Sequence, residues 1–437
     1  MIKLEKKALH VVAALVGCLL FLSCGGDQNF DDPNNPTLDG TAANVQNMIT
    51  GMEAGLRIDV DFYYQVVSII GRDAYYFQTA DPRYTGELLK GPIDAGGFLV
   101  QRTWASRYAV IRNGNLLMER LPDFGLSGTQ ESGARGVAKT FQAYQFLLNL
   151  NFTHNNGIRT DVAGELPGPW VSLAEGQAFI ADLLDEAHAD LQAGGDSFAF
   201  GLTTGFAGFD SPATFATFNR GLKARVEAYR GNWQSCLDAL AESFIDSAEG
   251  ADMYTGTYHV FGSAAGDVLN WAFDNQSANN ILWLAHPSTK TDAEAGDLRY
   301  TNKINERSNV NRLDGLESNL GITIAALNTS PFTIMRNEEL LLLRAEANIN
   351  LGNLTDGEAD LNVVRAAAGL EGVVLSNMND GINQMLFERR YSLFLEGHRW
   401  IDTRRYNHFP DLPLDRGDDG RGPDIIIPEM PRPANEF

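Results

Sequence analysis

The residue types that could recognise a ligand are concentrated between residues 72 and 97. In this stretch, RDAYYFQTADPRYTGELLKGPIDAGG, aromatic rings lie next to charged groups. Aromatic faces stack on the apolar faces of sugars or on peptide side chains, while carboxylate and guanidinium groups form bidentate hydrogen bonds. The stretch therefore predicts a loop that binds an oligosaccharide or a peptide. The ligand-binding candidates in it are Asp73, Tyr75, Tyr76, Asp81, Arg83 and Tyr84.

Motifs for catalysis are absent from the sequence. It contains no Gly-x-Ser-x-Gly, no His-Glu-x-x-His, no Gly-rich phosphate loop and no paired cysteines for zinc. Carboxylates are so abundant that a glycosidase-like pair stays open as an alternative, although no pair lies in a recognisable context. We therefore expect a protein that is not an enzyme.

One acidic loop near the C-terminus has the oxygen ligands that calcium prefers. The segment from Asp415 to Asp424, DRGDDGRGPD, lacks the spacing and the terminal glutamate of an EF-hand. A solvated loop is the simpler interpretation, so we expect no cofactor and keep calcium as the alternative.

Overall composition excludes some classes of partner. The chain has 437 residues, 44% of them hydrophobic, which is sufficient for a large core. It carries 34 basic and 56 acidic side chains, a net charge of -22. A chain this acidic is not expected to bind nucleic acid.

Helical periodicity begins near Ala43 and recurs until Arg405. The expected helices span residues 43–64, 98–120, 133–151, 172–193, 212–230 and 233–247. Partial alternation of Thr, Ile and Phe with polar residues favours short strands around residues 298–304 and 321–334.

Two segments of the chain repeat one pattern. Residues 224–240 align with residues 345–361, so that a Gly-Asn turn separates two apolar helical stretches in each. Small residues such as Ala345 and Ala347 let paired helices approach closely. The pattern predicts a mainly α fold, in which TPR-like helical hairpins form an α-α superhelix with long loops and a few short β-strands.

A second C-terminal segment, LFERRYSLFLEGHRWIDTRR at residues 386–405, carries many charges within an apolar helical pattern. Burying Arg399 or Glu388 without a partner would cost several kcal/mol, so we expect these charges to form internal pairs that lock the last helices. The segment contains Glu388, Arg389, Phe394, Glu396, Gly397, Arg399, Trp400, Asp402, Arg404 and Arg405. These residues resemble the C-terminal signature of the RagB/SusD family of outer-membrane nutrient-binding lipoproteins.

The resemblance implies a site and a partner. Family members commonly build the ligand site from loops in the N-terminal third and a mid-chain insertion, here residues 254–283 with Tyr254 and Tyr258. This adds Trp271 and Trp283 as ligand-binding candidates. The implied protein is non-catalytic, captures a nutrient, and passes it to a SusC-like TonB-dependent β-barrel transporter.

The N-terminus has the features of a secretory signal. Lysines precede an apolar run over residues 8–22, which is too short to span a bilayer. Cys24 follows, and resembles the acylated cysteine of a bacterial lipoprotein; Cys18 is the rival position. Acidic residues after Cys24 resemble an export tag for the cell surface, so we expect lipid anchoring in the outer membrane.

These observations define the expected organisation and its alternatives. Residues 1–23 are expected to be a lipoprotein signal peptide, residues 24–40 the acylated cysteine and a flexible tether, and residues 41–437 a single SusD-like domain. A TPR-like scaffold that binds proteins at the cell envelope is the main alternative function, and a surface hydrolase is a second. The identity of the ligand stays open.

Overall fold

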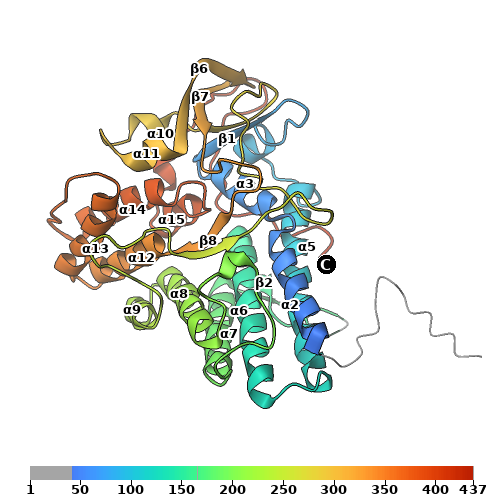
Figure 1. Cartoon of the computed structure of the whole chain (residues 1–437). Coiled ribbons are helices and arrows are strands. Elements are labelled where there is room, and N and C mark those ends of the chain that lie inside the picture. The colour runs from blue at the N-terminus through green and yellow to red at the C-terminus, as the bar shows by residue number, and fades with distance from the viewer. Residues whose placement is uncertain (1–41, 165, 437) are drawn as a thin grey trace, which may run out of the picture. The chain divides into compact units, whose positions relative to one another are not determined.

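Helices are the main regular elements of the fold, and many consecutive helices pack against each other (Figure 1). The computed structural model describes residues 42–164 and 166–436. The expected signal peptide, tether, Cys18 and Cys24 lie outside the described residues. The longer helices are α2 (Ala42–Arg57), α3 (Val60–Ile70), α5 (Phe98–Arg120), α6 (Gly128–Thr153), α7 (Leu173–Gln192), α8 (Pro212–Arg230), α9 (Trp233–Ala241), α12 (Asn337–Asn350), α13 (Leu354–Ala367), α14 (Met378–Ser392) and α15 (Arg399–Arg405).

Local sequence signals explain where several helices begin and end. Helix α7 starts at a capping box in which the Ser172 side chain accepts a hydrogen bond from the Glu175 backbone N–H and the Glu175 carboxylate accepts one from the Ser172 backbone N–H. The helix expected over residues 43–64 is divided, because Asp59 adopts a positive φ of 54° between α2 and α3. The bounds of α5 and α8 agree with the sequence-based prediction.

The two predicted hairpins are present and stack together. Helices α8 and α9 are joined at Gly231, and α12 and α13 are joined near Gly352; both glycines have positive φ, 73° and 84°. Helix α12 packs against α8, α9 and α13, so the first hairpin lies against the second. The fold is therefore mainly α with TPR-like hairpins, as the repeat predicts.

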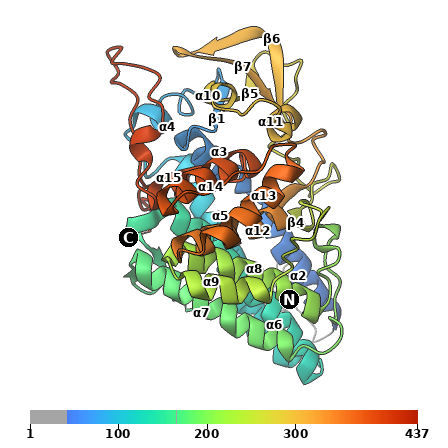
Figure 2. The ribbon, with the colours of Figure 1, turned by 90° about the vertical axis from the view of Figure 1, so that its left-hand side faces the viewer.

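A four-stranded sheet lies at the end of the fold opposite α6 and α7 (Figures 1 and 2). It has the strand order β1-β5-β7-β6. Its strands are β1 (Ala74–Gln78), β5 (Ile281–Ala285), β6 (Ile304–Leu313) and β7 (Leu316–Ile322). Two further pairs join β2 (Ile158–Arg159) to β3 (Trp170–Val171), and β4 (Gly256–His259) to β8 (Phe332–Arg336).

The strand expected over residues 298–304 is wrong, because most of that segment is the short helix α11 (Leu298–Lys303). The Asp297 side chain accepts a hydrogen bond from the Arg299 backbone N–H and starts the helix. The other short helices are α4 (Glu87–Lys90), α10 (Ser288–Thr291), η1 (Leu121–Asp123), η2 (His154–Asn156), η3 (Thr204–Phe206) and η4 (Phe409–Asp411).

The described residues, 42–164 and 166–436, form one compact unit. Within the described part of the chain, no helix combines the length and the apolar character that crossing a membrane requires. The division of residues 1–40 into signal peptide and tether stays a prediction.

Candidate ligand-binding site

The two segments that the sequence analysis assigned to the site meet in the sheet. Strand β1, from the N-terminal third, pairs antiparallel with β5, from the mid-chain insertion, and places Tyr76 opposite Trp283. The centroids of these two rings are 4.6 Å apart, and the Tyr84 ring lies 4.7 Å from Tyr76. Trp271 lies 5.6 Å from Trp283. The aromatic candidates Tyr76, Tyr84, Trp271 and Trp283 therefore form one cluster.

Much of this cluster is interior, which corrects the expectation of an open loop. Residues 74–78 form a strand whose side chains alternate between faces, so Tyr75 and Phe77 point inward and their rings stack 5.7 Å apart. Tyr84 and Trp283 cover Tyr76. The buried candidates are Asp73, Tyr75, Tyr84 and Trp283, each no more than 6% exposed. Packed in this way, these four side chains expose little surface, and their role in ligand binding stays a prediction.

The other candidates keep some exposure. Asp81 and Arg83 lie in a surface turn and pair with each other through two hydrogen bonds of 2.9 Å. Tyr76 and Trp271 are half-buried. Trp271 stacks on Tyr64 with ring centroids 5.6 Å apart. A role of these residues in ligand binding stays a prediction.

Open aromatic surface occurs instead at Tyr254 and Tyr258, at the start of the mid-chain insertion. Two hollows share these residues. The first hollow, of about 210 Å³, is lined by Tyr254, Tyr258, Asn302, Lys303, Thr323, Ile324, Pro331, Phe332, Thr333, Arg336, Phe394 and Glu396. The second hollow, of about 580 Å³, is lined by Thr204, Gly205, Ala207, Gly208, Phe209, Thr214, Thr217, Phe244, Tyr254, Thr255, Gly256 and Tyr258.

Strand β4 (labelled in Figure 2) positions the tyrosines by its alternation. Thr257 and His259 are buried, while Tyr258 between them is half-buried and faces the hollows. The Tyr258 hydroxyl donates a hydrogen bond to the backbone oxygen of Tyr254. Tyr254 is 57% exposed. The other tyrosines in the described part of the chain are buried or half-buried. The pair therefore offers a fixed aromatic surface to solvent.

A glycine permits the wall of the second hollow to lie close to β4. A Cβ atom at Gly205 in η3 would lie 2.0 Å from the backbone oxygen of Tyr258. Any side chain at this position would push η3 away from the strand, so the shape of the hollow depends on glycine here.

Charged groups line the floor of the first hollow. The Arg336 guanidinium lies 5.2 Å from the centre of the Tyr254 ring and pairs with Glu338 and with Glu396, the latter at 3.0 Å. Burial by itself would lower the pKa of Arg336, but these two carboxylates outweigh burial and raise it. The Lys303 Nζ donates hydrogen bonds of 2.8 and 2.5 Å to the backbone oxygens of Tyr391 and Ser392.

The pKa of Lys303 is lowered to about 8, because burial and the neighbouring Arg336 charge disfavour the ammonium form. The first hollow thus combines tyrosine rings with cationic donors and the carboxylate of Glu396. These are the groups that bind the faces and the hydroxyl groups of a polyol ligand.

The charged C-terminal segment is largely internal, as its sequence predicts. Glu388 is fully buried between Arg299 and Arg365, with contacts of 2.5 and 2.6 Å. The Arg389 guanidinium pairs with Asp402 at 2.7 Å. Phe394 and Glu396 from the same segment line the first hollow. The segment therefore joins the core to the site.

The loop from Asp415 to Asp424 is held by arginine. The Asp424 carboxylate accepts hydrogen bonds from the Arg416 side chain and from the backbone N–H groups of Asp415 and Arg416. Among the described residues, no group of three or more His, Cys, Asp or Glu side chains is placed to hold a metal ion. Calcium binding stays an untested alternative.

Sequence reasoning named Tyr254 and Tyr258 as part of the insertion but did not choose them as site residues, and it missed Lys303 and Arg336. A tyrosine pair around a glycine, Tyr254-Thr-Gly-Thr-Tyr258, is the signal that could have found the first two. Lys303 and Arg336 carry no such signal, because only the fold brings them to the tyrosines.

One family model matches part of the chain. Residues 255–424 match the model of the SusD family, and this range contains Tyr258, Lys303, Arg336 and Glu396. The fold is that of the SusD-like structures, with TPR-like helical hairpins. The match assigns residues 255–424 of the chain to the SusD family. No curated protein sequence matches it.

Solved structures share the fold over most of their length. A surface glycan-binding protein A from Bacteroides thetaiotaomicron has a TM-score of 0.67 at 13% identity, covering 92% of this chain and 97% of that chain. The same protein in complex with laminarihexaose has a TM-score of 0.66 at 13% identity, with 88% and 94% covered. A SusD-like carbohydrate binding protein from Bacteroides vulgatus ATCC 8482 has a TM-score of 0.63 at 15% identity, with 84% of each chain covered. At these identities the likeness establishes the fold.

Proposed function

We propose that this chain is a non-catalytic nutrient-uptake protein that binds an oligosaccharide at the two hollows around Tyr254 and Tyr258. The observation that carries the proposal is the exposed Tyr254 ring shared by two adjacent hollows. A ligand of several sugar rings can lie across Tyr254 and reach both hollows, with ring faces on the tyrosines and hydroxyl groups on Lys303 and Glu396. The match to the SusD family and the glycan-binding fold relatives support it.

The binding step is tested by replacing Tyr254 with alanine in the full chain. We expect affinity for a bound oligosaccharide to fall about ten-fold, because one stacking surface is lost. Isothermal titration calorimetry against a panel of oligosaccharides that includes laminarihexaose measures this change. Tyr254→Phe is the matched control, because it keeps the ring and should keep most of the affinity.

Equal loss of affinity in Tyr254→Phe and Tyr254→Ala would contradict stacking as the cause. Unchanged affinity in Tyr254→Ala would place the ligand elsewhere, with the cluster of Tyr76 and Trp271 as the next site to test. Turnover of the bound oligosaccharide would contradict the non-catalytic function and favour the hydrolase alternative.

We further propose that the chain is anchored by an acylated Cys24 at the cell surface and passes its ligand to a SusC-like TonB-dependent transporter. The match to the SusD family supports this partner, and the transporter would supply the energy for uptake. A tagged, full-length chain purified from its native membranes in mild detergent should carry a stoichiometric large β-barrel protein, identified by mass spectrometry. Recovery of soluble envelope proteins without a barrel would favour the protein-binding scaffold instead.

A further inference from the structure

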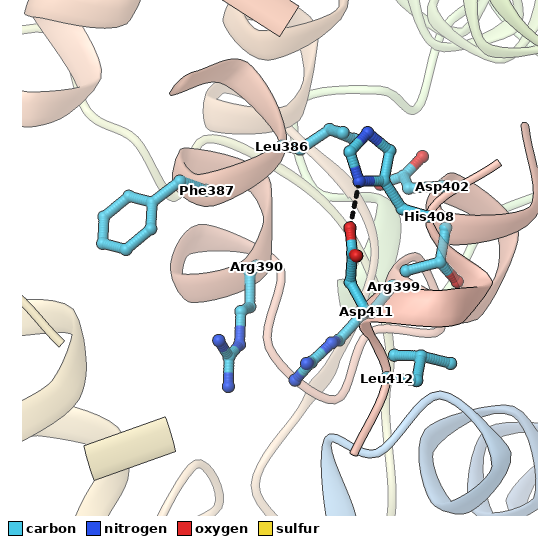
Figure 3. Close-up of a pocket in the computed structure, with 9 residues that line it drawn as sticks. Leu386, Phe387, Arg390, Arg399, Asp402, His408, Asp411 and Leu412 are labelled. Atoms are coloured by element: carbon cyan, nitrogen blue, oxygen red, sulfur yellow. Dashed lines mark hydrogen bonds and ion pairs between the residues drawn. The ribbon is translucent and has the colours of Figure 1, made fainter. Parts of the chain in front are cut away.

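A third hollow lies among helices α14 and α15 and the turn η4, apart from the tyrosines (Figure 3). It has a volume of about 170 Å³. Its cationic groups are Arg390 from α14 and Arg399 from α15, and the two side chains extend in the same direction (Figure 3). Its apolar wall is formed by Leu386, Phe387 and Leu412. None of these residues lines the two hollows around Tyr254.

The Arg399 guanidinium is held at one edge, through Nη1. Its Nη1 donates a hydrogen bond of 3.0 Å to the backbone oxygen of Arg72 and lies 3.6 Å from Oδ1 of Asp73. The side chain is 11% exposed and lines the third hollow. Burial, and then the charge of Arg390, lower the pKa of Arg399 to about 10.

The Arg390 guanidinium is incompletely paired. Its Nη1 donates to Asp292 at 2.6 Å and its Nη2 donates to the hydroxyl of Ser288 at 2.7 Å. Its Nε is buried without an acceptor in the described part of the chain. A buried donor without a partner is costly, so the Arg390 guanidinium lacks one acceptor.

The acidic residues on the wall of the third hollow do not supply that acceptor. Asp402 pairs with Arg389 and Arg405, at 2.7 and 3.3 Å. Asp411 pairs with His408 at 2.5 Å and its side chain is 70% exposed, so solvent screens its charge.

We propose that the third hollow binds the carboxylate of a small organic acid, with the carboxylate on Arg390 and Arg399 and the organic part against Phe387, Leu386 and Leu412. Guanidinium donors match the two oxygens of a planar carboxylate. Each arginine already has one acidic neighbour, Asp292 for Arg390 and Asp73 for Arg399, so the site favours a single negative charge over a dianion such as phosphate. The site is separate from the proposed oligosaccharide site.

Calorimetry on the full chain with benzoate tests the proposal, with benzamide as a neutral ligand of the same shape. We expect benzoate to bind, and benzamide and inorganic phosphate to bind at least about ten-fold more weakly. Arg399→Lys keeps the charge but loses the fork of donors, and should weaken benzoate binding about ten-fold. Arg312→Gln, at an exposed ion pair away from the hollow, is the matched control and should leave benzoate binding unchanged.

A fluorescent reporter keeps the test independent of how Arg399→Lys folds. Phe387→Trp places an indole on the apolar wall, and its emission relative to the parent chain should change with benzoate and not with benzamide. Equal binding of benzoate and benzamide, phosphate binding as tight as benzoate, or an unchanged affinity in a folded Arg399→Lys would each overturn the proposal. None of these results bears on oligosaccharide binding at Tyr254, so the two sites can fail separately.

Discussion

Replacing Glu388 with glutamine should lower the free energy of unfolding by about 3–5 kcal/mol, the usual cost of breaking a buried ion pair. Glu388 is fully buried, and its two oxygens contact Arg299 at 2.5 Å and Arg365 at 2.6 Å. Glutamine has nearly the same shape but no charge, so among the described residues Arg299 keeps only Asp297 and Arg365 keeps only Glu294 as a counter-ion. Urea unfolding of the two proteins, followed by circular dichroism, measures the difference.

Glu317→Gln is the control for this experiment. Glu317 pairs with Arg312 at 2.8 Å, but both side chains are at least 60% exposed. Exposed pairs contribute little, so this variant should remain within about 0.5 kcal/mol of the parent chain. Similar losses in the two variants would show that burial of Glu388 is not the cause.

Acid should destabilise the protein through its buried histidines, with His259 as the clearest case. His259 is 2% exposed and follows Tyr258 on β4. Burial, and then the charges of Arg107 and Arg57, lower its pKa to about 3. In the unfolded chain a histidine has a pKa of about 6.5. Between these values the unfolded state binds a proton that the folded state does not.

The sign of the effect follows from this difference. The stability is fully present above about pH 6.5 and is lost progressively as the pH falls toward 3. For His259 alone, one pKa unit corresponds to 1.36 kcal/mol, so about 2 kcal/mol is lost between pH 7 and pH 5. Urea unfolding at the two pH values should show a smaller loss in His259→Gln than in the parent chain. The same loss in both would contradict the assignment to His259.

The charged C-terminal segment shows how much of the fold could be predicted from local pattern. Its expected internal pairing follows from the cost of burying unpaired charges, and Glu388 and Arg389 are paired as expected. The bounds of α5 and α8 were predictable because apolar periodicity and end signals act within a few residues. Residues 298–304 were mispredicted as a strand, because their Thr and Tyr favour strands while the Asp297 cap starts a helix.

The site was less predictable than the fold. Aromatic residues at 72–97 indicated ligand recognition, but the same residue types also form cores, and Tyr75 and Tyr84 are interior. No local feature distinguishes a tyrosine that a strand turns inward from one that it turns outward.

The helical hairpins, the family signature and the absence of known catalytic motifs could be read from the residues alone, because each depends on residue types at short and regular spacing. Which aromatic rings remain exposed, and which charges surround them, depends on how distant segments pack together. Arg336 and Glu396 are 60 residues apart and pair at 3.0 Å beside Tyr254. Such proximity arises from strand pairing and helix packing across long loops, which residue spacing does not encode.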